Sequence, residues 1–240
     1  MIKAVVAGAA GRMGKRLVTL LREDSRFQVV GAVEQKGHAS LGLDAGEVAG
    51  AGTLGVSIVD SLERALPGVQ VVLDFTAPAA AMEHLETASR HGVAMVVGTT
   101  GLSGADLDRA RDLASRAPIV QSPNMSVGVN VLYGILAQVA RTLGDSYDIE
   151  VIEAHHHFKK DAPSGTAERM AQVMAEAMGR DLKEVGVYGR HGMVGERTAR
   201  EIGVHAIRAG DFVGEHTILF GGLGEQIEIR HRAQSRDNFA

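Results

Sequence analysis

The sequence predicts an α/β protein, with a doubly wound parallel sheet over residues 1–125 and a second α+β domain with a mixed four-stranded sheet over residues 126–234. Two observations carry this prediction. In the first half of the chain, short apolar runs alternate with amphipathic helical patterns, as in a parallel sheet covered by helices. Beyond residue 126, a long apolar helix is followed by alternating strand patterns, which are typical of a sheet with one covered face.

The first half of the chain supplies the strands and helices of the parallel sheet. Each apolar run is short and ends in glycine or a polar turn, which favours strands, and the segments between them carry apolar residues at helical spacing. Strands are expected at "IKAVVAG" (2–8), "FQVVGAV" (27–33), "VQVVLDFT" (69–76), "VAMVVGTTG" (93–101) and "PIVQSPN" (118–124). Helices are expected at 12–24, from Pro78 to about His91, and at about 104–116.

The second half begins with the helix "SVGVNVLYGILAQVARTLG", for which Ser126 is a suitable N-cap residue. A strand, "YDIEVIEAHH", follows, and then a helix from about Thr166 to Met178. Residues 180–200 are rich in glycine and charge, so a long loop is expected there. Three further strands are expected at "IGVHAIRA", "VGEHTILFG" and "EQIEIRHRA". Because one helical layer covers only one face of this sheet, we expect the other face to pack on a partner subunit.

Composition excludes several classes of function. The 240 residues are 45% hydrophobic and 22% charged with a formal net charge of −4, so the chain resembles an ordinary soluble protein without a basic, nucleic-acid-binding character. The absence of cysteine excludes disulfides, thiolate nucleophiles and cysteine-ligated metal centres, and with them a cysteine-dependent aldehyde dehydrogenase. We read no signal peptide and no apolar run long enough to span a membrane, so a cytoplasmic protein is expected.

A glycine-rich turn, "GAAGRMG", joins the first strand to the first helix. Its glycines, Gly8, Gly11 and Gly14, have a looser spacing than the strict dinucleotide fingerprint. The context is more specific, because Glu34 ends the second strand twenty residues after Gly14, where a carboxylate can accept both ribose hydroxyls of an adenosine. A helix N-terminus also favours a pyrophosphate. The turn therefore predicts a Rossmann-like dinucleotide site; the alternative is a tight turn of small residues with Glu34 merely solvated.

Two further segments end later strands of the parallel sheet. "GTTG" (98–101) and "SPNM" (122–125) lie at the carboxyl edge, where open α/β sheets bind their ligands. Their backbone and hydroxyl groups could hold the nicotinamide ribose and carboxamide. Ordinary strand-end turns would explain the same residues equally well.

The segment "EAHHHFKKDAPSGTA" (153–167) concentrates proton carriers and cations after a strand. Since alternate side chains of a strand share a face, His155 and His157 could lie together, which raises the question of a metal. Glu153 and Asp161 are the nearby acids, but no second ligand group has a recognisable spacing, so no metal is predicted. A histidine that donates a proton near neutral pH is the better interpretation.

The end of the same segment favours an anionic ligand. Ser164 is a suitable N-cap residue, so the amides of Gly165 and Thr166 would open a helix and face an anion. Lys159 and Lys160 add positive charge. Together these residues predict a small carboxylic acid as ligand; a polar surface loop capped by a helix is the alternative.

These stretches carry a family resemblance. In order along the chain, "VAGAAGRMG", "DFT", "GTTG", "SPNMSVGVN", "EAHHHFKKDAPSGTA" and "GEHTILF" resemble the 4-hydroxy-tetrahydrodipicolinate reductase (dihydrodipicolinate reductase) family over essentially the whole chain. The resemblance implies NAD(P)H-dependent reduction of 4-hydroxy-tetrahydrodipicolinate, via dihydrodipicolinate, to tetrahydrodipicolinate in diaminopimelate and lysine biosynthesis. It also implies a cytoplasmic homotetramer joined through the second domain's sheets, with no metal, nucleic acid or membrane as partner.

The resemblance further implies roles for individual residues. His155 would be the proton donor and acceptor, and Lys159 the second donor. The substrate carboxylates would contact His156, Gly165 and Thr166. The cofactor, NADH or NADPH, would be lined by Gly8, Ala9, Ala10, Gly11, Arg12, Met13, Glu34, Gly98, Thr99, Thr100, Ser122, Pro123, Asn124 and Met125.

The chain departs from the family pattern in three places. Gln35 and then Lys36 follow Glu34, where the family often has arginine, so we expect NADH to be used well and NADPH to be tolerated. His157 and Phe158 replace a more usual Arg-His pair. The chain ends at Ala240, where relatives continue through another helix, and the tail 235–240 is expected to return to the first domain.

An alternative function belongs to a different class: a non-catalytic NAD(P)-sensing regulator on the same scaffold. Such a regulator would need the glycine turn but not a proton donor beside a site for carboxylates.

Overall fold

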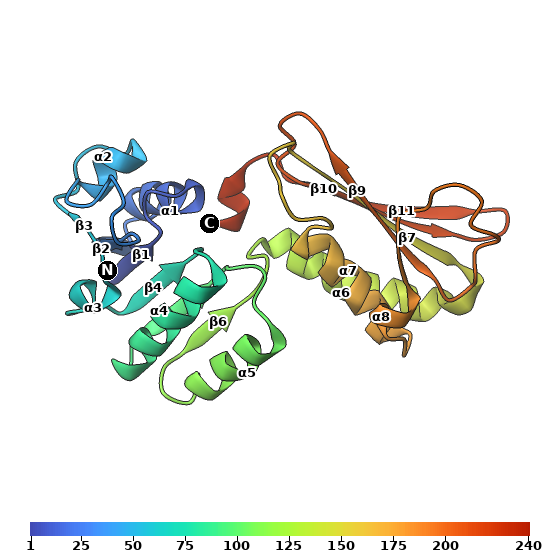
Figure 1. Ribbon diagram of the computed structural model, residues 1–240, viewed down its shortest axis with the longest axis horizontal. Helices are drawn as coiled ribbons and strands as arrows, with labels where there is room; N and C mark the ends of the chain where they lie inside the picture. The colour runs from blue at the N-terminus through green and yellow to red at the C-terminus, as the bar shows by residue number, and fades with distance from the viewer. The chain divides into compact units, whose positions relative to one another are not determined.

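Six parallel strands form the sheet of the first half of the chain in the computed structural model, which describes residues 1–240 (Figure 1). The strand order is β3-β2-β1-β4-β5-β6, so the order reverses between β1 and β4, which pair with each other. Ligands of such sheets bind where the order reverses, at the carboxyl ends of the strands. The strands are β1 (Ile2–Ala7), β2 (Phe27–Val33), β3 (Ile58–Val59), β4 (Val71–Asp74), β5 (Ala94–Val97) and β6 (Ile119–Gln121).

Helices cover both faces of this sheet, because alternate residues of each strand face opposite ways. In β1, Ala4 and Val6 join the cluster of buried residues that includes α1 (Arg12–Glu23). Val5 and Ala7 join the cluster on the other face, with residues of α4 (Pro78–Arg90) and α5 (Gly104–Leu113). The predicted doubly wound parallel sheet is therefore confirmed.

Three short elements between β2 and β4 are absent from the sequence-based prediction. They are α2 (Ala45–Ala49), β3 and α3 (Leu62–Ala65). Each is five residues or shorter, so none of them extends far enough to establish a period of hydrophobic residues.

The chain divides into two units, Met1–Pro123 with Phe239–Ala240, and Asn124–Asn238. The first unit thus contains the parallel sheet and the last two residues of the chain, of which Phe239 ends a short 3-10 helix, η2 (Arg236–Phe239). We describe each unit by itself below.

The second unit contains a mixed sheet with the order β11-β10-β7-β9-β8. β7 runs parallel to β9 and antiparallel to β10. Its elements are α6 (Val127–Leu143), η1 (Gly144–Ser146), β7 (Asp148–His155), α7 (Gly165–Ala177), α8 (Leu182–Val185), β8 (Gly186–Tyr188), β9 (Ile202–Arg208), β10 (Glu215–Gly221) and β11 (Gln226–Arg232).

This sheet corrects the predicted strand count from four to five. The extra strand, β8, lies within residues 180–200, which the sequence predicts to be one long loop, and α8 lies there as well. β8 has only three residues, "GVY", in a segment rich in glycine and charge. β8 is an edge strand, and its pairing with β9 is a long-range contact that local sequence does not encode.

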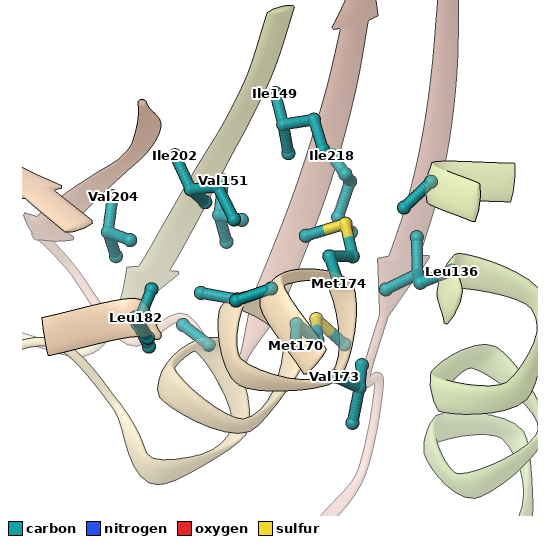
Figure 2. Packing of buried hydrophobic residues seen from close by; sticks show 14 of the residues in the cluster. Leu136, Ile149, Val151, Met170, Val173, Met174, Leu182, Ile202, Val204 and Ile218 are labelled. Carbon is teal, nitrogen blue, oxygen red and sulfur yellow. The ribbon is translucent and has the colours of Figure 1, made fainter. Parts of the chain in front are cut away.

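The core of the second unit lies between the sheet and its two long helices. Figure 2 shows Met170, Val173 and Met174 of α7 beside the strands that carry Ile149 and Ile218. The prediction that Ser126 and Ser164 cap α6 and α7 is confirmed, because each side chain accepts a hydrogen bond from the amide three residues later.

The sequence analysis expected no segment long and apolar enough to span a membrane, and helix α6 differs from that expectation. By length and composition alone, Val127–Ser146 is apolar enough to cross a bilayer. A core helix of a folded domain has the same composition, however, and Val129, Leu132 and Leu136 are buried in the core of the second unit.

Candidate active site

The glycine turn at the end of β1 brings the start of α1 against the strand. Gly8 has a φ of +68°, a left-handed conformation that favours glycine, and its carbonyl accepts a hydrogen bond from Gly11 N at 2.9 Å. A Cβ on Gly14 would lie only 2.0 Å from the carbonyl oxygen of Gly8. The close approach leaves the first amides of α1 at the carboxyl edge of β1, where a phosphate can accept from them.

Glu34 lies directly against this turn, although the two are far apart in sequence. Its Oε1 accepts a hydrogen bond from Ala10 N at 3.0 Å, and its Oε2 accepts one from Gln35 N at 3.1 Å. Glu34, Gly8, Ala10 and Gly11 line one cavity of about 820 Å³. A carboxylate beside a helix N-terminus, in a cavity of this size, fits the ribose and pyrophosphate of a dinucleotide.

Apart from Lys36, several other walls of this cavity come from residues to which the sequence analysis gave no role. Asp74, at the end of β4, is fully buried, and its Oδ2 contacts His84 Nδ1 of α4 at 2.6 Å. Its Oδ1 accepts from the amide of Thr76 at 2.8 Å. His84 and Thr76 line the cavity, as do the cationic Lys36 and Arg90. The motif "DFT", which the sequence analysis quoted only for the family resemblance, contains Asp74 and Thr76 and could have indicated this part of the cavity.

The second group of expected cofactor residues lies at the ends of β5 and β6, outside the lining of this cavity. A Cβ on Gly98 would lie 2.1 Å from the ring of Phe75. Because glycine has no side chain, this ring can pack directly against the backbone of Gly98. Thr99 Oγ1 donates to Asp74 Oδ1 at 3.4 Å, which ties β5 to β4.

The remaining expected cofactor residues occupy varied positions. Ala9 is buried in the core, so only its backbone could meet a ligand, while Arg12 is exposed and Met13 half-buried. Ser122 and Pro123 end the first unit, whereas Asn124 and Met125 begin the second. Thr100, after β5, is exposed.

In the second unit, β7 presents His155 on its inner face beside an unexpected partner. Glu153 is 0% exposed, and its Oε2 lies 2.6 Å from His155 Nδ1. Burial by itself would raise the pKa of Glu153, but hydrogen bonds from His155 and Arg208 outweigh it and lower that pKa to about 2. Glu153 is therefore an ionised carboxylate inside the protein.

Three further elements contact this pair. Arg208 of β9 donates to both carboxylate oxygens of Glu153, each at 2.8 Å. The backbone amide of Ser164 donates to Glu153 Oε1 at 3.0 Å. His216 of β10 lies with its ring 5.4 Å from that of His155, edge to face, and its Nε2 is 3.3 Å from Ser164 Oγ. Arg208 and His216 are functional candidates that the sequence analysis missed, and Glu153, which it considered only as a possible metal ligand, is the partner of His155.

The N-terminus of α7 has the geometry of an anion site. Ser164 Oγ accepts from Ala167 N at 3.2 Å, which leaves the amides of Gly165 and Thr166 without helical acceptors, as in any first turn. Thr166 Oγ1 accepts from Asn124 Nδ2 at 2.9 Å, so an expected substrate residue and an expected cofactor residue are hydrogen-bonded. The positive end of the helix favours a carboxylate here.

The cations and remaining histidines lie in the segment between β7 and α7. Lys159 Nζ is 2.8 and 2.9 Å from the two oxygens of Asp161, and the amide of His156 donates to Phe212 O. The ring of His157 packs on Phe158 with 3.7 Å between centroids. No group of three or more histidine, aspartate or glutamate side chains is placed to hold a metal ion.

Comparisons with known proteins agree over both units. Residues 2–125 match the family described as dihydrodipicolinate reductase, N-terminus, and residues 128–240 match its C-terminus. Two relatives named 4-hydroxy-tetrahydrodipicolinate reductase come from Syntrophus aciditrophicus (strain SB), at 52% identity, and Syntrophobacter fumaroxidans (strain DSM 10017 / MPOB), at 54%. Each alignment covers 100% of this chain and 90% of the relative.

Solved structures give the same result. The dipicolinate-bound dihydrodipicolinate reductase from Paenisporosarcina sp. TG-14 aligns with a TM-score of 0.71 at 26% identity, over 100% of this chain and 90% of that one. The WlbA dehydrogenase from Thermus thermophilus, in complex with NAD and alpha-ketoglutarate, aligns with a TM-score of 0.60 over 95% of this chain and 83% of that one. At 14% identity, the second likeness concerns the fold alone.

Proposed function

The chain belongs to the dihydrodipicolinate reductase family, and from that premise we propose which of its residues carry out the reaction. The enzyme reduces 4-hydroxy-tetrahydrodipicolinate, via dihydrodipicolinate, to tetrahydrodipicolinate with NADH or NADPH, a step of diaminopimelate and lysine biosynthesis. The observation that carries our assignment of residues is the His155–Glu153 pair beside the N-terminus of α7.

The first unit binds the cofactor, which supplies the hydride when bound. Glu34 accepts hydrogen bonds from the ribose hydroxyls of the adenosine, and the amides at the start of α1 donate hydrogen bonds to the pyrophosphate. The cavity that Glu34 shares with Gly8, Ala10 and Gly11 supports this assignment. The strand ends at Gly98–Thr100 and Ser122–Met125 hold the nicotinamide ribose and carboxamide.

The second unit binds the substrate through its carboxylates. The amides of Gly165 and Thr166 donate hydrogen bonds to one carboxylate at the positive end of α7, and His156 contacts the substrate beside it. The dipicolinate-bound relative supports a small dicarboxylate as the ligand class.

His155 and Lys159 supply the proton that balances the hydride. His155 donates from its ring, and Lys159 is the second donor from the segment that follows β7. The Lys159 side chain is 20% exposed and paired with Asp161. A substrate carboxylate would compete with Asp161 for this ammonium group.

The non-catalytic regulator is not favoured. Relatives that align over the whole chain are named as reductases, and a sensor would have no use for a histidine–carboxylate pair beside a carboxylate site.

We also propose a cytoplasmic homotetramer joined through the outer face of the second unit's sheet. Helices α6 and α7 pack with the face that carries Ile149 and Val151. The opposite face presents Ile207, which is 47% exposed, and charged side chains such as Glu215 and Arg232. Light scattering of the purified protein tests the tetramer; a monomer at micromolar concentration would contradict it.

The activity itself is tested by the loss of NADH absorbance when the substrate is generated in situ from pyruvate and aspartate semialdehyde. We expect turnover that depends on both precursors. Binding of NADH without any substrate-dependent oxidation would favour the regulator instead.

A further inference from the structure

We propose that Glu153 is the positioning residue of this site: it holds His155 with a proton on Nδ1, so that Nε2 exchanges the catalytic proton, and it anchors the start of α7. This inference rests on the proposed function, in which His155 is the proton donor. It goes further by assigning a role to a residue outside the site predicted from the sequence.

The position of Glu153 in the strand is unusual for a carboxylate. In β7, Ile149 and Val151 point into the core, and Glu153 follows them on the same face. Strand alternation predicts an apolar residue at this place. Burying an ionised carboxylate without partners costs several kcal/mol, so a charge on the core face requires compensation.

The compensation is complete, because four hydrogen bonds reach the two oxygens of Glu153. Oε1 accepts from Ser164 N at 3.0 Å and Arg208 Nη2 at 2.8 Å. Oε2 contacts His155 Nδ1 at 2.6 Å and accepts from Arg208 Nη1 at 2.8 Å. Each oxygen thus has two partners, which is the full capacity of a carboxylate. One side chain thereby joins β7, β9, the proton donor and the N-cap residue of α7.

The ionised state of Glu153 determines which nitrogen of His155 can react. An ionised carboxylate only accepts hydrogen bonds, so His155 must donate from Nδ1. The neutral ring then carries a lone pair on Nε2, and the protonated ring has its second proton there. Nε2 lies against Gly214, where a Cβ would be only 3.0 Å away, so glycine leaves space beside the reactive nitrogen.

The other charged and titratable groups around His155 do not replace this anion. Arg208 faces it from β9, and its charge is committed to Glu153. His216 faces it from β10, and burial lowers the pKa of His216 to about 3, so that ring is neutral at the pH of the reaction. From the following segment, Asp161 is paired with Lys159. Glu153 is thus the carboxylate in contact with the ring.

Glu150 provides a matched control on the same strand. It faces the opposite side of the sheet, where it is held by Arg190 and Arg197 and lies 2.7 Å from His205 Nε2. Glu150 is only partly buried, with a side chain 20% exposed, but like Glu153 it accepts hydrogen bonds that lower its pKa to about 2. Substitution of Glu150 therefore shows the effect of removing a paired carboxylate from β7 while the contacts of His155 stay unchanged.

The first experiment compares Glu153→Gln, Glu153→Asp and Glu150→Gln in the full-length protein. For Glu153→Gln we expect kcat to fall at least about tenfold, with NADH binding unchanged. Because glutamine removes the negative charge beside the ring, the alkaline decline of kcat should move to lower pH. Glu153→Asp keeps the charge and should recover the position of this decline. Glu150 lies on the proposed subunit interface, so light scattering checks the assembly of Glu150→Gln, and this variant should keep the kcat and pH profile of the unsubstituted enzyme when it is assembled. Unchanged kcat and pH profile in a folded Glu153→Gln variant would overturn the proposal.

A second measurement does not depend on the folding of any Glu153 variant. Nitrogen-15 NMR of histidine side chains distinguishes the two neutral tautomers, and the His155 signals are assigned by their loss in His155→Asn. We expect the Nδ1–H tautomer in the unsubstituted protein, and an Nε2–H tautomer would refute the role of Glu153. If the unsubstituted protein shows no substrate-dependent NADH oxidation, the proposed function fails instead, while the tautomer still decides the assignment of Glu153.

Discussion

Lys159 is a residue whose surroundings became clear only in the folded chain. The sequence analysis treated it as a free cation, whereas the structure pairs its Nζ with Asp161. Burial would raise the pKa of Asp161, but the hydrogen bond and charge of Lys159 lower it. An ion pair that is partly exposed is worth at most about 1 kcal/mol, so a substrate carboxylate can displace Asp161.

We therefore predict that Lys159→Ala lowers kcat by roughly two orders of magnitude or more, as expected for the loss of a general acid. Binding of NADH, followed by nicotinamide fluorescence, should not change, because the cofactor cavity lies in the other unit. Lys183→Ala, which removes an exposed lysine of α8, is the control. Near-normal turnover in Lys159→Ala would show that the second donor is a different group.

Gln35 is the residue that we expect to set cofactor preference. Glu34 accepts from ribose hydroxyls and repels a 2′-phosphate, and Gln35 adds no compensating charge. Lys36 and Arg90 line the same cavity, so we expect NADPH to be tolerated. We expect kcat/KM to favour NADH, and Gln35→Arg to improve NADPH use selectively, measured for both cofactors at one ionic strength.

Lys36→Ala, in the same assay, shows how much that cation contributes to NADPH use. An exposed point charge should contribute at most about 1 kcal/mol, which is roughly fivefold in kcat/KM. A preference of the unsubstituted enzyme for NADPH above about tenfold would mean that another group in the cavity binds the 2′-phosphate.

At the scale of elements, helices α1 and α7 each begin at a proposed ligand site. The geometry of such a site depends on how closely the first turn of the helix approaches the neighbouring strand. Gly14 in α1 illustrates this, because a Cβ there would lie 2.0 Å from Gly8 O and 2.7 Å from Ala9 Cα, both of them backbone atoms. Gly134, inside α6, has nothing within 4 Å of the same position.

We predict opposite effects on stability for the two substitutions. Gly14→Ala should destabilise the protein by about 1–3 kcal/mol through overpacking and weaken NADH binding. Gly134→Ala should leave NADH binding unchanged and stabilise the helix by up to about 1 kcal/mol, because alanine restricts the unfolded chain. Denaturant titration followed by circular dichroism, with NADH binding in parallel, provides the measurement. Equal effects of the two substitutions would contradict the close approach at Gly14.

Helix α7 leads to a prediction about inhibitors. Two carboxylates of a ligand can contact the amides of Gly165 and Thr166 and the cations nearby, whereas a monocarboxylate loses one of these contacts. Such a charge-assisted contact is worth about 1.5–3 kcal/mol. Pyridine-2,6-dicarboxylate should therefore inhibit competitively, and pyridine-2-carboxylate at least about tenfold more weakly. Equal inhibition constants would rule out a two-carboxylate site.

At the scale of the whole molecule, the two units can be followed separately. The chain has three tyrosines and no tryptophan, and Tyr133, Tyr147 and Tyr188 all lie in the second unit. Tyrosine fluorescence therefore reports the unfolding of the second unit, and NADH binding reports the integrity of the first.

Acidification should destabilise the second unit in two overlapping steps. Burial, followed by the charge of His155, lowers the pKa of His216 from 6.5 to about 3. Between these values the unfolded chain binds a proton that the folded chain does not. The contribution of His216 to the free energy of unfolding is therefore fully present above pH 6.5, and it decreases by about 1.4 kcal/mol for each pH unit below that value. His231, whose pKa is also lowered by burial, acts in the same direction.

The carboxylates act in a lower range of pH. Since the pKa values of Glu150 and Glu153 are lowered from 4.5 to about 2, their contribution is present above 4.5 and lost as the pH falls toward 2. Urea unfolding followed by tyrosine fluorescence at pH 7, 6 and 5 should therefore isolate the histidines. His216→Gln should flatten this slope, and parallel slopes in the two proteins would contradict a buried neutral His216.

The sequence by itself determined the elements whose signals are local. The apolar periods of β1, α1 and α6, the N-cap serines of α6 and α7, and the glycine turn at Gly8 all arise from residues a few positions apart. The His155–Lys159 segment was found in the same way, since its chemistry is written in consecutive residues.

Only the tertiary structure decided which residues surround these segments. Glu153 and His155 are neighbours on one face of β7, but Arg208 of β9 and the cap of α7 reach Glu153 only in the folded chain, and Asp74 meets His84 across ten residues. The edge strand β8 likewise exists through its pairing with β9. Each of these features is a contact between distant segments, and its free energy depends on burial and geometry that arise only when the chain has folded.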